Sequence, residues 1–180
     1  MTDSASAPQS SDGTSEFKAG LVELLPHLRA FARGLCGRAD KADDLVQEAV
    51  LRAWSARDTF KPGTNLKAWL FTIARNHFLN DLRRNRRETQ LEEGQAEVAL
   101  VKEADQEEGL ILDDLHLALE RLPAERREAL LLVGASGFSY EEAAQVCGVA
   151  VGTIKSRVAR GRVQLAQLLG NDEAGGADEG

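Results

Sequence analysis

Basic and hydroxyl side chains recur at helical spacing between residues 149 and 169. This stretch holds four bases and no acid. One helical face would carry Thr153, Ser156, Arg157 and Arg160 at spacing i, i+3, i+4 and i+7, with Lys155 beside them. A guanidinium can donate two hydrogen bonds to the edge of a guanine. These five side chains are therefore predicted to read duplex DNA, with a merely solvated basic face as the alternative.

A second polar ridge runs along residues 66–87. Asn76, Asn80, Arg83 and Arg87 are separated by four, three and four residues, so amides and guanidiniums share one side of a predicted helix, and Arg84 enlarges the basic cluster at its end. Such groups suit phosphates and exposed bases. This ridge is therefore a candidate surface for single-stranded DNA.

A smaller patch consists of Asp44, Gln47 and Glu48, on a helix expected from about residue 41 to Trp54. The apolar stripe of the same helix needs only other positions, including Leu45, Val46 and Ala49. By spacing alone the patch is an ordinary solvated face.

The C-terminal basic face depends on a predicted helix-turn-helix. Ser139 followed three residues later by Glu142 is a capping box, which marks the start of a helix. Gly148 is predicted to end that helix, and a second helix over residues 153–169 buries Ile154, Val158, Leu165 and Leu168. This pair of helices with a tight turn is typical of DNA-binding proteins, in which the second helix enters the major groove.

Helical periodicity also covers the N-terminal half. Apolar residues predict helices over residues 21–35, from about 41 to 54, and from Leu66 onwards, with a break at the Pro62–Gly63 pair. Two short helices are expected up to Pro123 and over residues 126–133. The predicted fold class is all-α, with two small helical domains.

The charge distribution gives the domain boundaries. The net charge of the 180 residues is −7, and the two tails supply all of it: residues 1–16 carry three acids and residues 170–180 carry four, without a base. Residues 88–114 carry ten acids and one base, whereas residues 17–87 and 115–169 are both net basic. We therefore expect disordered tails at 1–16 and 170–180, domains at 17–87 and 115–169, and a flexible acidic linker at 88–114.

Several function classes are disfavoured. The longest apolar run, residues 129–133, is far too short to span a membrane, and the first 16 residues lack the features of a signal peptide, so a cytoplasmic protein is expected. Neither the histidines nor the widely separated Cys36 and Cys147 have metal-ligand or disulfide spacing. The sequence predicts no metal, no cofactor and no catalytic residue. A carboxylate-dependent nuclease is the weakest interpretation, because the acids gather in the connector and at helix starts.

Three segments in this order resemble regions 2.2, 2.3 to 2.4 and 4.2 of the extracytoplasmic-function (ECF) sigma factors. They are residues 43–49 (DDLVQEA), 65–76 (NLKAWLFTIARN) and 151–157 (VGTIKSR), and the resemblance covers about residues 17–169. More narrowly, residues 25–33 (LPHLRAFAR) and 134–144 (GASGFSYEEAA) are similar to the EcfG general-stress subgroup.

The resemblance implies a role for each set of residues. Asp44, Gln47 and Glu48 match positions that bind core RNA polymerase. Thr153, Lys155, Ser156, Arg157 and Arg160 match the reader of the −35 element. The −10 element is assigned to Asn65, Trp69, Asn76, Asn80, Arg83, Arg84 and Arg87. The implied function is promoter recognition and opening in a stress response, with an anti-sigma factor as a further partner and no small-molecule substrate.

Two alternatives remain open from the sequence. A sigma-like mimic would titrate an anti-sigma factor without binding DNA, and a helix-turn-helix regulator would bind duplex DNA as a dimer. The retained basic reader helix and the absence of a receiver domain argue against the mimic. A footprint obtained without polymerase would favour the dimer.

Overall fold

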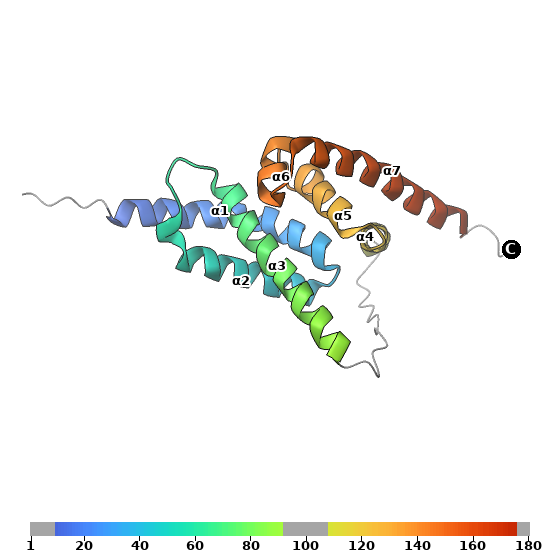
Figure 1. The fold of residues 1–180 in the computed structure, drawn as a ribbon, viewed down its shortest axis with the longest axis horizontal. Coiled ribbons are helices and arrows are strands. Elements are labelled where there is room, and N and C mark those ends of the chain that lie inside the picture. The colour runs from blue at the N-terminus through green and yellow to red at the C-terminus, as the bar shows by residue number, and fades with distance from the viewer. Residues whose placement is uncertain (1–9, 92–107, 176–180) are drawn as a thin grey trace, which may run out of the picture.

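The computed structural model describes residues 10–91 and 108–175, which form two helical units (Figure 1). The N-terminal unit holds α1 (Ser10–Cys36), α2 (Ala39–Ser55), the short 3-10 helix η1 (Arg57–Thr59) and α3 (Leu66–Leu91). The C-terminal unit holds α4 (Glu108–Glu120), α5 (Ala124–Leu130), the π-helical turn η2 (Leu131–Ala135), α6 (Tyr140–Cys147) and α7 (Val151–Gly175). The predicted all-α class is confirmed, since no strand occurs in the described residues.

The N-terminal unit is built on the apolar stripes that the periodicity predicts. Leu28 and Phe31 of α1, Ala49 of α2, and Leu70 and Phe71 of α3 are completely buried between the three helices. Near the N-terminal end of α3, the ring of Phe17 lies 5.6 Å from that of Phe60 and 6.0 Å from that of Trp69. Trp69 therefore packs within an aromatic cluster.

A tight turn sets the start of α3. Gly63 has a φ of +82°, and the Thr64 N–H donates to the Lys61 carbonyl oxygen at 3.2 Å, which is a type II turn with Pro62 and Gly63 at its centre. Asn65 follows immediately, and its side-chain oxygen accepts the N–H of Ala68 at 2.9 Å. The turn and this helix cap fix where the ridge of α3 begins.

The helix-turn-helix forms at the predicted place. The Ser139 hydroxyl accepts the Glu142 N–H at 3.1 Å, while the Glu142 carboxylate accepts the Ser139 N–H at 2.8 Å. Gly148 ends α6 with a left-handed φ of +66°. Ile154 and Val158 of α7 are buried on its inner side.

The segment boundaries differ from those expected. The structure begins α1 at Ser10, continues α3 to Leu91, begins α4 at Glu108 and carries α7 to Gly175, so helices extend into all three segments expected to be unstructured. Good helix formers without Pro or Gly extend α3, and acids at the start of α4 are favourable near a helix N-terminus. The remainder of the expected tails and linker, at 1–9, 92–107 and 176–180, lies outside the described residues.

The two units share one hydrophobic core, which the sequence did not predict. The Phe71 ring of α3 meets the Phe138 ring of the C-terminal unit edge-on, with centroids 4.9 Å apart. Gly34 of α1 approaches Leu131 so closely that a Cβ built there would lie 3.1 Å from the Leu131 Cγ. In Figure 1 the helices α4–α7, yellow to red, accordingly lie against one side of the blue-to-green N-terminal unit.

Candidate nucleic-acid interface

The predicted reader residues lie on the outer side of α7. Thr153, Lys155 and Arg160 are exposed, and Ser156 and Arg157 are half-buried. The ammonium of Lys155 lies 5.9 Å from the centre of the Tyr140 ring, which orients one cation of the face. The structure thus places all five side chains along one helix, as the spacing predicts.

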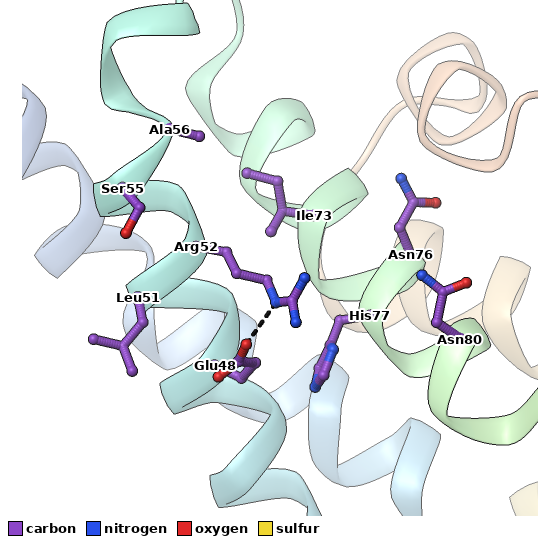
Figure 2. Close-up of a pocket in the computed structure, with 9 residues that line it drawn as sticks. All are labelled: Glu48, Leu51, Arg52, Ser55, Ala56, Ile73, Asn76, His77 and Asn80. Atoms are coloured by element: carbon purple, nitrogen blue, oxygen red, sulfur yellow. Dashed lines mark hydrogen bonds and ion pairs between the residues drawn. The ribbon is translucent and has the colours of Figure 1, made fainter. Parts of the chain in front are cut away.

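An open groove of about 560 Å³ lies between α2 and α3 (Figure 2). Glu48 lines it from α2, and Asn76 and Asn80 line it from α3. One groove thus brings together residues from two sets that the sequence treated separately. A polymerase contact and a DNA contact would therefore be immediate neighbours.

Sequence reasoning missed the other groove residues. Arg52 donates to the Glu48 carboxylate at 2.6 Å, and Ile73 and His77 face α2 from α3 (Figure 2). The spacing of four residues between Glu48 and Arg52 is the signal that could have found this pair. Because both side chains are substantially exposed, the pair positions a guanidinium in the groove and contributes little to stability.

The remaining predicted residues occupy three surroundings. Asp44 and Gln47 are exposed on α2. Arg83, Arg84 and Arg87 are exposed in the C-terminal part of α3, and Arg84 lies 3.3 Å from the Asp81 carboxylate. Asn65 and Trp69 are held at the start of α3 by the helix cap and the aromatic cluster. The structure does not bring these two side chains into the groove of Asn76 and Asn80.

The described residues contain no group of histidine, cysteine or acidic side chains that could hold a metal ion. None of the helices in the described ranges is both long and apolar enough to cross a membrane. Cys36 and Cys147 are free thiols.

Comparison with known proteins decides the family. Residues 21–88 match the model of Sigma-70 region 2, and residues 112–165 match that of Sigma-70 region 4. Over 161 residues, 89% of each protein, the chain is 52% identical to the ECF RNA polymerase sigma factor EcfG of Rhodopseudomonas palustris. The chain belongs to the ECF sigma factors. It is an alternative sigma factor. The other interpretation of the sequence, a dimeric helix-turn-helix regulator, is therefore excluded.

Solved structures of sigma factors agree with this assignment. The sigma factor RpoE of Bartonella quintana, in a co-crystal with the anti-sigma factor NepR, matches with a TM-score of 0.78 and 47% identity over 92% of this chain and 99% of that one. CnrH in complex with the cytosolic domain of CnrY matches with a TM-score of 0.67 and 29% identity, over 90% of this chain and 95% of that one. In sigma-factor terms, the N-terminal unit is region 2 and the C-terminal unit is region 4.

Proposed function

We propose that this sigma factor binds core RNA polymerase through the exposed face of α2, holds the opened −10 strand on α3, and reads the −35 element with α7. The observation that carries the proposal is the groove that joins Glu48 to Asn76 and Asn80. The α2 side of this groove can contact the polymerase, and the α3 side can contact DNA.

The described chemistry suits strand capture without catalysis. Amides and guanidiniums on α3 can bind bases and phosphates, and each base that stacks on an aromatic ring contributes about 1 to 3 kcal/mol against the cost of opening the duplex. The polymerase performs the bond-making step, so the sigma factor itself is not an enzyme. Its place of work is the cytoplasm, where the polymerase is.

The test of the polymerase surface is a triple variant. Asp44→Ala, Gln47→Ala and Glu48→Ala together should leave the protein folded, because Asp44 and Gln47 are exposed and the partner of Glu48 within the described residues is the exposed Arg52. The variant should fail to co-purify with core polymerase and fail in run-off transcription. A double variant of exposed acids on α1, Glu16→Ala with Glu23→Ala, changes the charge equally and should bind as the parent does. Unchanged binding of the triple variant would refute the assignment.

The protein is further proposed to work in a stress response under an anti-sigma factor. Two similarities support this. The chain is 52% identical in sequence to an EcfG protein and 47% identical to a sigma factor that was crystallised with the anti-sigma factor NepR. The inhibitor should contact both units, since each carries a surface that must be hidden. Affinity capture of the tagged protein from unstressed cells should recover a small protein that blocks core binding, and its absence would count against this part of the proposal.

Promoter-dependent transcription is the property that a sigma-like mimic would lack. A mimic would bind the inhibitor but would not direct transcription. Run-off transcription by core polymerase from a promoter library, with and without the protein, separates the two, because only a sigma factor yields promoter-dependent transcripts.

A further inference from the structure

The C-terminal unit contains another open groove, which lies between α5 and α7 and has a volume of about 480 Å³. Arg126 lines it from α5, and Arg160, Gln164 and Gln167 are among the residues that line it from α7. None of the described residues that line this groove is acidic. A lining with two guanidiniums and two amides, and without a carboxylate, favours an anion as the ligand.

The groove continues the predicted reading face of α7. Arg160 belongs to both, and Gln164 and Gln167 follow it by four and seven residues, which places them on the same side of the helix. Gln164 therefore lies about 6 Å further along the helix axis than Arg160. The major groove of DNA is only about 12 Å wide and is bounded by phosphate backbones. Side chains that extend the reading face beyond Arg160 are therefore expected to meet a backbone phosphate.

Arg126 is held at this groove by two features. Its Nη1 donates to Gln164 Oε1 at 2.7 Å, and both residues are half-buried. Gly161 lets α5 approach α7, since a Cβ built there would lie 3.5 Å from the Arg126 Cβ. The bond to Gln164 uses one of the five N–H donors of the guanidinium. Among the described residues no carboxylate forms an ion pair with Arg126, so its charge is not neutralised in that way.

We propose that the groove between α5 and α7 binds a backbone phosphate beside the −35 element, with Arg126 as the main donor. Gln164 is a positioning residue, because its hydrogen bond restricts the guanidinium before DNA binds. The inference rests on the proposed role of α7 as the −35 reader and adds a residue that lies outside the helix-turn-helix. Duplex DNA is favoured over an acidic protein segment as the occupant, because the groove adjoins the reading face and shares Arg160 with it. Since a phosphate contact carries no sequence information, Arg126 should control affinity and leave promoter preference unchanged.

The test is the salt dependence of promoter binding by holoenzyme assembled from core polymerase and the full chain. Fluorescence anisotropy of a labelled promoter gives the affinity at several salt concentrations. Arg126→Met keeps the aliphatic stem but removes the charge, so it should lower the affinity about tenfold at moderate salt and reduce the salt slope by about 0.9. Its preference at a randomised −35 element should equal that of the parent. An unchanged slope or an altered preference would overturn the proposal.

Arg162→Met is the matched control. Arg162 is exposed on α7 two residues after Arg160, so it faces another side of the helix, and it is not among the residues that line the groove. Removing its charge should change neither affinity nor slope, and an equal loss in both variants would overturn the site. Arg126→Met should co-purify with core polymerase as the parent does. Weakened co-purification would assign the groove to the polymerase and would also overturn the proposal.

The positioning role has a separate test. Gln164→Met removes the acceptor but keeps a side chain of similar length, and it should weaken promoter binding by a smaller factor than Arg126→Met does. In an Arg126→Met parent, Gln164→Met should have no further effect, because the bond is already absent. An equal loss in both backgrounds would show that Gln164 does not act through Arg126. Partial misfolding would reduce the amplitude of binding and not the salt slope.

Arg157→Ala distinguishes failure of this inference from failure of the proposed function. If α7 reads the −35 element, Arg157→Ala should relax the preference there. An unrelaxed preference would contradict the proposed function itself. A relaxed preference together with an unchanged salt slope in Arg126→Met would contradict only the phosphate site.

Discussion

At the scale of single residues, the two basic surfaces have different expected tasks. Arg157 lies half-buried on the reading face of α7, where bidentate contact with a guanine contributes about 1 to 3 kcal/mol of discrimination. Arg84 lies exposed in the C-terminal part of α3, where a phosphate contact carries no sequence information. The surfaces should therefore respond differently to substitution.

Arg157→Ala should relax the preference at the −35 element, whereas Arg84→Ala should weaken all promoters alike. The slope of the salt dependence should fall by about one unit for each phosphate that the protein no longer binds, so it should change in Arg84→Ala. Asn76→Ala should alter preference at the −10 element only. The measurement is transcription from promoters randomised separately at each element, over a range of salt concentrations. Identical changes in Arg157→Ala and Arg84→Ala would contradict the division.

Gly161 lies inside α7, where it permits close packing against Leu130 of α5. A glycine inside a helix costs about 1 kcal/mol relative to alanine. A Cβ at Gly161 would lie 2.9 Å from Leu130 Cδ1 and 3.1 Å from Leu130 Cγ, so the missing side chain lets α5 pack closely on α7. The close contact between α5 and α7 thus offsets the low helix propensity of Gly161.

Two alanine substitutions in α7 test this role. Gly170→Ala meets no atom within 4 Å and should raise the free energy of unfolding by about 0.5 to 1 kcal/mol. Gly161→Ala should be less stable than Gly170→Ala by about 1 to 2 kcal/mol, because the added methyl group overpacks against Leu130. Urea unfolding followed by circular dichroism gives both values. Equal stability of the two variants would show that the contact with Leu130 is not limiting.

At the scale of elements, the capping box controls the start of the helix-turn-helix. Ser139→Ala removes the acceptor of the Glu142 N–H and should lower the free energy of unfolding by about 1 kcal/mol. Ser15→Ala, at an exposed position inside α1, is the matched control and should be neutral or slightly stabilising. Thermal unfolding of the two variants gives the comparison. A loss in Ser15→Ala as large as in Ser139→Ala would mean that the cap is not the cause.

Elements that carry local signals could be predicted from the sequence. The capping box at Ser139 to Glu142, the left-handed Gly148 and the turn at Pro62–Gly63 are each defined by neighbouring residues, and each occurs where expected. Helix ends in the charged segments were misplaced, because high charge density was taken as a sign of disorder although those residues also form helices.

The candidate site was predictable to the extent that it depends on one helix. The face of α7 follows from spacing alone, but the groove depends on how α2 and α3 lie against each other, and no periodicity encodes that. The Arg75–Glu128 pair joins residues 53 positions apart. Arg75 had only its place in a family motif to mark it, so the docked arrangement of the units could not be predicted.

At the scale of the whole molecule, both thiols lie where the units meet. Burial raises the pKa of Cys36 to about 11 and that of Cys147 to about 12. Arg127 of the C-terminal unit opposes the shift at Cys36, and Arg75 of the N-terminal unit opposes the shift at Cys147. The pKa of each thiol is therefore influenced by an arginine of the other unit.

Alkylation of these thiols should consequently be slow in the folded protein. A pKa near 12 instead of 9.0 leaves roughly a thousandfold less thiolate at pH 8, and the thiolate is the reactive form. The rate for Cys147 with iodoacetamide should be more than about a hundredfold below that in urea, and it should rise about tenfold for each pH unit above 8. Peptide mass spectrometry separates the two thiols. A folded-state rate equal to that in urea would contradict the burial.

The carboxylate of Glu142 takes part in two contacts, one within the helix-turn-helix and one with Asn65 of the N-terminal unit. One oxygen is already held by the Ser139 N–H within α6, and this hydrogen bond is the main reason that the pKa of Glu142 is lowered and the group stays ionised. A free glutamate loses up to about 2 kcal/mol of rotamer entropy when it is immobilised. Since the cap has already immobilised Glu142, the bond from Asn65 requires little further ordering. The start of the helix-turn-helix thus presents a preorganised acceptor to the N-terminal unit, which lowers the entropy cost of forming the contact between Asn65 and Glu142.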